Sequence, residues 1–85
     1  MAKISADLKS KWEHNPNATT SVIVMTQNES AEYASLMSPR GITVTRVFTL
    51  IHGLALTGLA SAMLALANEP WVVSIEEDRP VHTMT

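Results

Sequence analysis

Three consecutive acids, Glu76, Glu77 and Asp78, form the densest group of ionisable side chains in this sequence. They follow residues 71–75, whose β-branched and aromatic side chains predict a strand. Most such charge runs are solvated strand ends that discourage pairing at a sheet edge. Carboxylates at a strand end can instead cap the amide groups at the N-terminus of a partner's helix, where the helix dipole is positive. The residue types alone leave both interpretations open.

A short tail, residues 79–85, follows the acids. Pro80 lacks a backbone donor and biases its preceding residue toward an extended conformation. An extended segment can add a strand to another protein's cleft, where backbone hydrogen bonds supply affinity and alternate side chains supply selectivity. Val81 and Met84 are the apolar members of this tail, and Pro80 reduces the entropy lost on docking. We therefore expect the tail to bind in a groove of another protein.

The other polar residues lack the spacing that catalysis or metal binding requires. His14, His52 and His82 fall in three separate segments, without a second histidine or carboxylate at ligand spacing. The three glycines are isolated, and the sequence has neither a nucleophile elbow nor a phosphate-cradling loop. A core this small also leaves little room for a substrate cleft. We expect no enzymatic activity, no metal and no cofactor.

The composition describes one small globular domain without covalent staples. The chain has 85 residues, of which 46% are hydrophobic, and it has no cysteine. Disulfides, thiol catalysis and cysteine-bound metals are therefore excluded. Because a domain of this size is only marginally stable, a protein partner would stabilise it by mass action.

The charge pattern argues against nucleic acid as a ligand. The formal net charge is −2, and the six Lys and Arg residues are scattered along the chain. Without a basic patch the chain has no means of neutralising a phosphate backbone. Residues 1–14 are not followed by the apolar segment of a secretory signal, so we expect a cytoplasmic protein unless a leader has been removed.

Residues 1–18 form an N-terminal extension that stands apart from the rest of the chain. Ile4, Leu8 and Trp12 recur at helical spacing, and Ser5 can cap a helix that begins after it. Two interpretations stay open, a short helix and a partly ordered extension.

Beyond residue 18, strand and helix patterns alternate. Apolar and β-branched runs predict four strands, at 19–26, 42–51, 54–57 and 71–75. Apolar residues at helical spacing predict helices at 29–37 and 58–68. The expected cap of the first helix is Asn28, and the expected inward side chains are Tyr33, Leu36 and Met37 in the first helix and Leu59, Met63 and Leu66 in the second.

One uncharged stretch, residues 47–67, is long enough to span a bilayer. It contains His52, Gly53 and Gly58, which interrupt a continuous apolar helix. A strand, a turn, a second strand and an amphipathic helix explain these interruptions better. We therefore expect no membrane span.

The predicted order β-α-β-β-α-β over residues 19–78 is that of the α+β, ferredoxin-like or split βαβ fold. It consists of a four-stranded antiparallel sheet with both helices on one face. The other face is then left bare, and here it would carry Val, Ile and Thr rather than charge. An uncovered apolar face predicts that another molecule docks on it.

A longer pattern runs through residues 53–57, 59–66 and 68–78. A glycine and a bulky apolar residue open a strand, a helix closes on Glu69-Pro70, and the chain continues as Trp-Val-Val-Ser-Ile-Glu-Glu-Asp. This pattern resembles the propeptides of subtilisin-like serine proteases and their stand-alone inhibitor relatives, whose last strand has the form Val-x-x-Ile/Val-Glu-x-Asp. The resemblance spans residues 20–85 and is most specific at 68–78.

The resemblance implies how such a protein acts. In the family, the bare sheet face packs on two parallel surface helices of the protease, and the residues at the positions of Glu76 and Asp78 cap those helices. The C-terminal tail then lies in the active-site cleft like a product. The residues that would bind the cleft are Val81, His82, Thr83 and Met84, with Met84 in the primary specificity pocket and Val81 in the distal apolar pocket.

Some features depart from the family pattern. Residues 1–18 have no counterpart, and Leu54 replaces a common aromatic residue. No protease domain follows Thr85, which favours inhibition in trans over an in-chain folding role, although a folding helper is compatible with the pattern. The alternative hypothesis is a ferredoxin-like binding or oligomerisation module without a protease partner, its bare face buried against a second copy. A homo-oligomer is open but not favoured.

Overall fold

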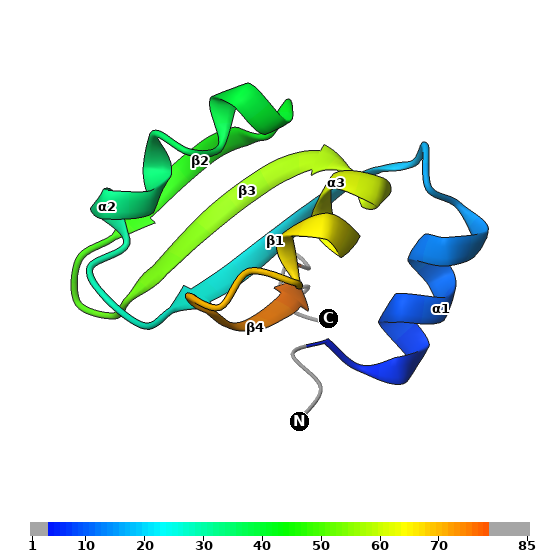
Figure 1. Cartoon of the computed structure of the whole chain (residues 1–85), viewed down its shortest axis with the longest axis horizontal. Coiled ribbons are helices and arrows are strands. Elements are labelled where there is room, and N and C mark those ends of the chain that lie inside the picture. Colours follow the sequence, from blue (N-terminus) through cyan, green and yellow to red (C-terminus); the bar gives the residue numbers. More distant parts are fainter. Residues whose placement is uncertain (1–3, 79–85) are drawn as a thin grey trace, which may run out of the picture.

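The structure is a computed structural model that describes residues 4–78 (Figure 1). It is an α+β fold with a four-stranded antiparallel sheet and helices. The elements are α1 (Ala6–His14), β1 (Thr19–Thr26), α2 (Ala31–Ala34), the 3₁₀ turn η1 (Ser38–Arg40), β2 (Thr43–Phe48), β3 (Gly53–Leu59), α3 (Ala60–Leu66) and β4 (Val72–Glu77). The order β-α-β-β-α-β predicted over residues 19–78 is not matched exactly: the 3₁₀ turn η1 follows α2, and the strands lie in the order β2-β3-β1-β4. The predicted cleft-binding residues Val81, His82, Thr83 and Met84 lie outside the described residues.

The sheet has the strand order β2-β3-β1-β4, so β1 and β3 are central and β2 and β4 are edges. Every neighbouring pair is antiparallel. The central strand β1 spans Thr19–Thr26, as its continuous apolar run predicted. Apolar residues on both faces suit a strand with a neighbour on each side, and β1 pairs with β3 and with β4.

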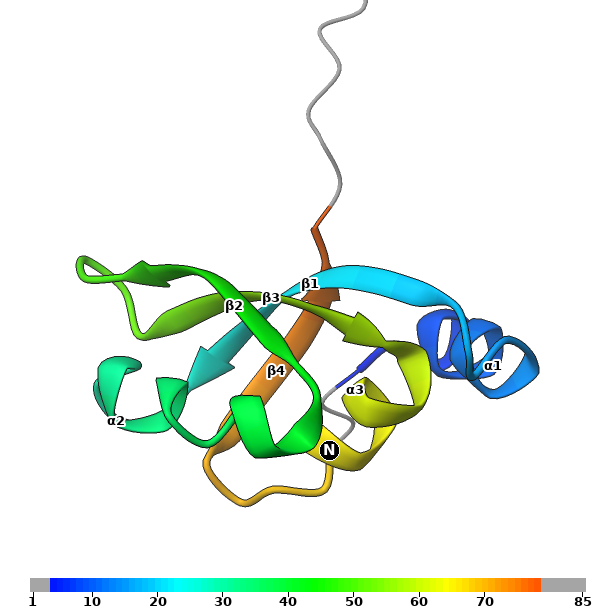
Figure 2. The ribbon, with the colours of Figure 1, turned by 90° about the horizontal axis from the view of Figure 1, so that it is seen from above.

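The helices α1, α2 and α3 lie on the same side of the sheet (Figure 2). On that side, the alternate residues Val22 and Val24 of β1 and Leu54 and Leu56 of β3 are buried, as is Ile75 of β4. From α3, the side chains that close the core are Ala60, Met63 and Leu66. No helix among residues 4–78 covers the other side of the sheet, which we call the open face (Figure 2).

Of the two interpretations of residues 1–18, the short helix is the one observed, as α1, and it packs into the core and does not stand apart from the rest of the chain. The predicted cap is confirmed, because Ser5 Oγ accepts a hydrogen bond of 3.1 Å from the backbone N–H of Leu8. Ile4, Leu8 and Trp12 are all buried and join the same cluster as the sheet residues. The indole Nε1 of Trp12 is buried without a hydrogen-bond partner among residues 4–78, so apolar contact is what holds this ring in place.

Helix α2 is much shorter than the predicted 29–37. The Oγ of Ser30 donates to the backbone oxygen of Phe48, 2.8 Å away, and not to its own helix. Asn28, the predicted cap, donates through Nδ2 to the Tyr33 hydroxyl instead. Met37 is buried as predicted, but Leu36 is 44% exposed, because α2 ends before it.

The second predicted strand, 42–51, ends early and changes face on the way. The pairing of β2 with β3 shifts between Val44 and Arg46, so Thr45 is an extra residue and its hydroxyl donates to Ala55 O. Such a bulge reverses the alternation that follows it. Val44 and Phe48, predicted to share a face, therefore lie on opposite faces, and Leu50 in the hairpin is 98% exposed.

Similarly, Leu59 was predicted to face inward from a helix over 58–68. It is the last residue of β3 and is 44% exposed, because α3 begins only at Ala60. Gly58 is still in the strand, where an added Cβ would lie 3.4 Å from side-chain atoms of Ile42 and Met63.

Truncating Trp12 tests whether α1 belongs to the core. We expect Trp12→Ala to lower the free energy of unfolding by about 3–5 kcal/mol, the cost of deleting a large buried side chain. Urea denaturation followed by circular dichroism measures this change. Glu13→Ala, at the exposed neighbouring position, serves as the control and should change stability by less than about 0.5 kcal/mol. Equal stability of the two variants would contradict the assignment of α1 to the core.

Candidate interface on the open sheet face

The open face is ordered into three rows, each with one residue from every strand. The pairing of β2 with β3, of β3 with β1 and of β1 with β4 determines which residues lie side by side. Asp78 extends the last pairing, since its N–H donates to Ser21 O over 2.8 Å. In the order β2, β3, β1, β4, row 1 is Phe48, Gly53, Met25 and Ser74; row 2 is Arg46, Ala55, Ile23 and Glu76; row 3 is Thr43, Thr57, Ser21 and Asp78.

Row 1, apart from Ser74 on β4, and the centre of row 2 are apolar. A Cβ added to Gly53 would lie 3.3 Å from Met25 Sδ and 3.4 Å from Phe48 Cδ2, so these two side chains lean over the glycine from both sides. The guanidinium of Arg46 lies 5.9 Å from the centre of the Phe48 ring, within range of a cation–π contact. This part of the face is therefore an apolar surface with the exposed positive charge of Arg46 beside it.

Row 3 is hydrophilic. The hydroxyls of Ser21 and Thr57 lie 3.1 Å apart on the two central strands, and either can be the donor. Thr43 and Asp78 stand at the two ends of the row and are exposed. Along the strands the open face thus changes from apolar at the β2–β3 hairpin end to hydroxyl-bearing in row 3; beyond row 3, β3 ends at Leu59, which pairs with Thr19 and is exposed.

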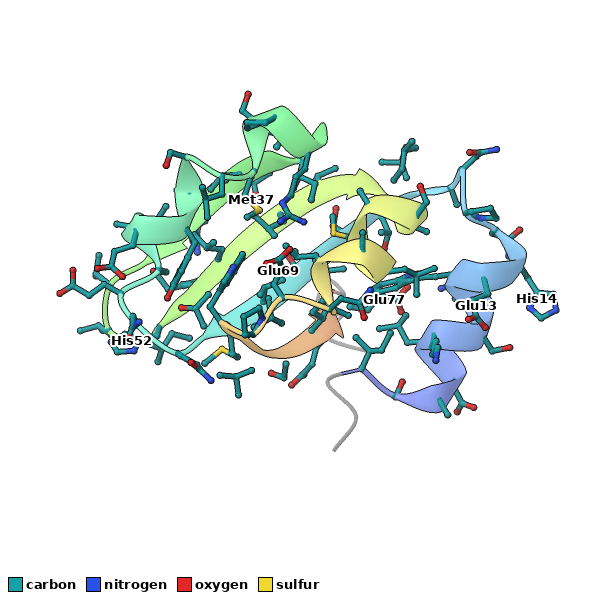
Figure 3. All side chains as sticks on the ribbon, viewed as in Figure 1. Glu13, His14, Met37, His52, Glu69 and Glu77 are labelled. Carbon is teal, nitrogen blue, oxygen red and sulfur yellow. The ribbon has the colours of Figure 1, made fainter. Side chains whose placement is uncertain are left out.

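The acid run is divided between the two faces of the sheet. Glu76 pairs with Ile23 and Asp78 with Ser21, so both acids belong to the open face. Glu77 pairs with Val22 on the helix side, where its carboxylate is 2.7 Å from Lys11 Nζ of α1 (Figure 3). The first and third acids are therefore displayed together, about 7 Å apart along the strand, while the middle acid ties β4 to α1.

Neither histidine within residues 4–78 contributes to this surface. His14 and His52 lie on opposite sides of the molecule (Figure 3), and His82 lies outside the described residues. The Nδ1 of His14 is 2.7 Å from Ser10 O within α1. Residues 4–78 contain no group of three or more histidines and acids placed to hold a metal ion.

Two hollows border the sheet, and each is lined in part by residues of the open face: Phe48 in the smaller, Ser74 and Glu76 in the larger. A small one of about 220 Å³ is lined by Ser30, His52 and Glu29, among others. Its Ser30 hydroxyl is already engaged with Phe48 O, which fastens the start of α2 to the end of β2. A larger, open groove of about 660 Å³ runs between the start of α1 and β4, past Leu8 and Ile75.

None of the helices within residues 4–78 has the length and apolar character needed to cross a membrane. The uncharged stretch 47–67 is instead divided among the end of β2, the hairpin, β3 and α3.

Comparison with known proteins gives no assignment: no family model matches the chain, and no curated protein matches it either. The resemblance to subtilisin propeptides therefore stays a prediction that depends on the residues quoted for it.

The sequence predicted some of the residues that lie on the open face but not others. Glu76 and Asp78 were predicted as a pair, and the strand alternation that places them on one face is visible in the sequence. Arg46 and Phe48 were missed as members of the open face, because the bulge at Thr45 reverses their direction. The identity of Thr45 does not predict a bulge, because threonine is a favoured residue in regular strands.

The Lys11–Glu77 ion pair yields a test of how the acids are divided. A double-mutant cycle with Lys11→Gln and Glu77→Gln should give a coupling of about 0.5 kcal/mol, typical of a partly exposed pair, and the coupling should shrink in high salt. Pairing Lys11→Gln with Glu76→Gln is the control and should give no coupling, because Glu76 lies on the opposite face. Coupling of Lys11 to Glu76 would contradict the alternation.

Proposed function

We propose that this protein inhibits a subtilisin-like serine protease in trans, with a ferredoxin-like unit of four strands, α2 and α3 as its scaffold. Without α1 and η1, the elements follow the order β-α-β-β-α-β along the chain. On this proposal α1 is an addition that completes the core from the helix side. It leaves the open face unobstructed, since it packs against α3 and contacts Glu77.

One observation supports the proposal above the others: Glu76 and Asp78 share the open face, at the end of the strand that continues into the tail. Two carboxylates about 7 Å apart and pointing the same way suit the N-termini of two neighbouring helices. Each would accept hydrogen bonds from amides that have no partner within their own helix. Glu77, on the other face and engaged with Lys11, is not part of this contact.

The apolar rows of the open face would supply the rest of the docking surface. Ile23, Met25 and Phe48 are only partly buried within this chain, so a partner's side chains can cover them further. Burying apolar surface stabilises a complex roughly in proportion to the area removed from water. The face would thus anchor the protein while the carboxylates orient it.

The tail would then enter the catalytic cleft as an added strand. Met84 would fill the primary specificity pocket and Val81 the distal apolar pocket, with His82 and Thr83 between them. A segment held like a product by a large distant surface is a poor substrate, because its binding energy is not used to reach the transition state.

Removing the tail tests the proposed mechanism. Titration of subtilisin with the full chain should abolish its activity, whereas a chain that lacks residues 81–85 should leave the activity unchanged at the same concentrations. Both chains should give the same circular dichroism spectrum, because residues 4–78 contain all the described helices and strands. Equal inhibition by both chains would contradict a role for the tail, and no inhibition by the full chain would contradict the function itself.

Removing the two carboxylates tests the anchor separately. Glu76→Ala combined with Asp78→Ala should weaken protease binding by about 1–3 kcal/mol, the scale of charge-assisted hydrogen bonds at helix ends. Inhibition constants measured at low and high salt provide the comparison. Glu13→Ala combined with Glu29→Ala removes the same charge from exposed positions outside the open face, and it should leave binding within about 0.5 kcal/mol of the unaltered chain. Equal loss in both double variants would show that only net charge matters.

A further inference from the structure

The middle row of the open face carries opposite charges at its two ends. Arg46 stands on the β2 edge and Glu76 on the β4 edge, with Ala55 and Ile23 between them. Neighbouring strands are about 4.8 Å apart, so the two charges are separated by about 14 Å across the sheet. Within residues 4–78, neither side chain forms a salt bridge. Each molecule therefore presents a positive and a negative charge, separated by an apolar centre.

We propose that the open face binds the open face of a second copy of this chain, in a two-fold dimer where Arg46 of each copy meets Glu76 of the other. A two-fold axis that runs parallel to the strands, between β1 and β3, turns one sheet over onto the other. This rotation places β2 of one copy over β4 of its partner and keeps every row over the same row. A contact of this type is isologous, so each interaction occurs twice.

The other two rows are complementary under the same rotation. In row 1, Met25 lies over Gly53 of the partner copy, beside the Phe48 ring that leans over that glycine, while Phe48 lies over the small side chain of Ser74. In row 3, Thr43 lies over Asp78 of the second copy, so a hydroxyl donor meets a carboxylate acceptor. Sheets that pack face to face keep their strands within about 30° of one another, which this arrangement allows.

The charges select this axis over the other two-fold arrangement. An axis in the plane of the sheets but perpendicular to the strands would place β2 over β2, and Arg46 over or beside Arg46. It would also place the apolar row 1 over the hydroxyl-bearing row 3. Like charges and mismatched polarity disfavour that packing, so the face specifies one dimer and opposes its closest competitor.

The size of the face makes the dimer weak. Four strands and three rows span a footprint of roughly 400 Å², about half of what each partner buries in a standard stable interface. The dimer should therefore form and dissociate within a concentration range that is accessible in solution. A second copy and a protease would compete for the open face, but the dimer does not depend on the proposed inhibition.

Charge reversal provides a test that does not involve a protease. Sedimentation velocity of the full chain over a concentration series should show a monomer–dimer equilibrium that weakens with salt. Arg46→Glu alone and Glu76→Arg alone should each weaken the dimer about tenfold or more, since two like-charged contacts replace two attractive ones. A mixture of the two variants should restore dimers, because one copy then carries acids at both positions and the other carries arginines at both.

Two controls separate pairing from loss of fold or change of net charge. The chain with both Arg46→Glu and Glu76→Arg has the original net charge and should dimerise like the unaltered protein. Lys9→Glu makes the same charge change as Arg46→Glu at an exposed position of α1 and should leave the dissociation constant unchanged. A full chain that stays monomeric at millimolar concentration would overturn the proposal. So would an unweakened Arg46→Glu variant, or a mixture that associates no better than its components.

Discussion

The antiparallel register between β1 and β4 determines the character of both faces of the sheet. Since the side-chain period of a strand is two, a shift of one residue would exchange Ile75 and Glu76 between the core and solvent. In the observed register Ile75 is buried opposite Val24, while Glu76 and Asp78 point away from the helices. Pairing of Glu77 with Lys11 supports the same register from the helix side. The core and the candidate interface therefore depend on one set of backbone hydrogen bonds.

A second constraint is the amount of apolar surface that a chain of this length can bury. With all helices on one side, the sheet can form only one core, and α1 enlarges it through Ile4, Leu8 and Trp12. The opposite side keeps apolar side chains in partial contact with water, as Met25 and Phe48 do beside Gly53. This arrangement makes the face suitable for another molecule at a cost to the stability of the free protein, and both proposals use that property.

The sequence predicts those parts of the fold that depend on local patterns. The strand β1 has its predicted bounds because a continuous apolar run with two neighbouring strands is unambiguous. Helix α2 was predicted too long, since the Ser30–Phe48 hydrogen bond joins residues 18 positions apart and no local pattern contains it. The division of the acids could be anticipated from alternation, but Arg46 could not be placed, because the bulge at Thr45 is a property of the pairing and not of the residue.

The position of β4 in the sheet has a consequence for folding. β4 is the last described strand in the chain, yet it covers one edge of the central strand β1 from Ser21 to Thr26, including its continuous apolar run. Until β4 docks, β1 presents unpaired amides and carbonyls beside Val22, Ile23 and Val24, the kind of edge that templates aggregation. Most of the domain can therefore be synthesised before this edge of β1 is paired. The docking of β4 is then the step that withdraws the edge from pairing with other unfolded chains.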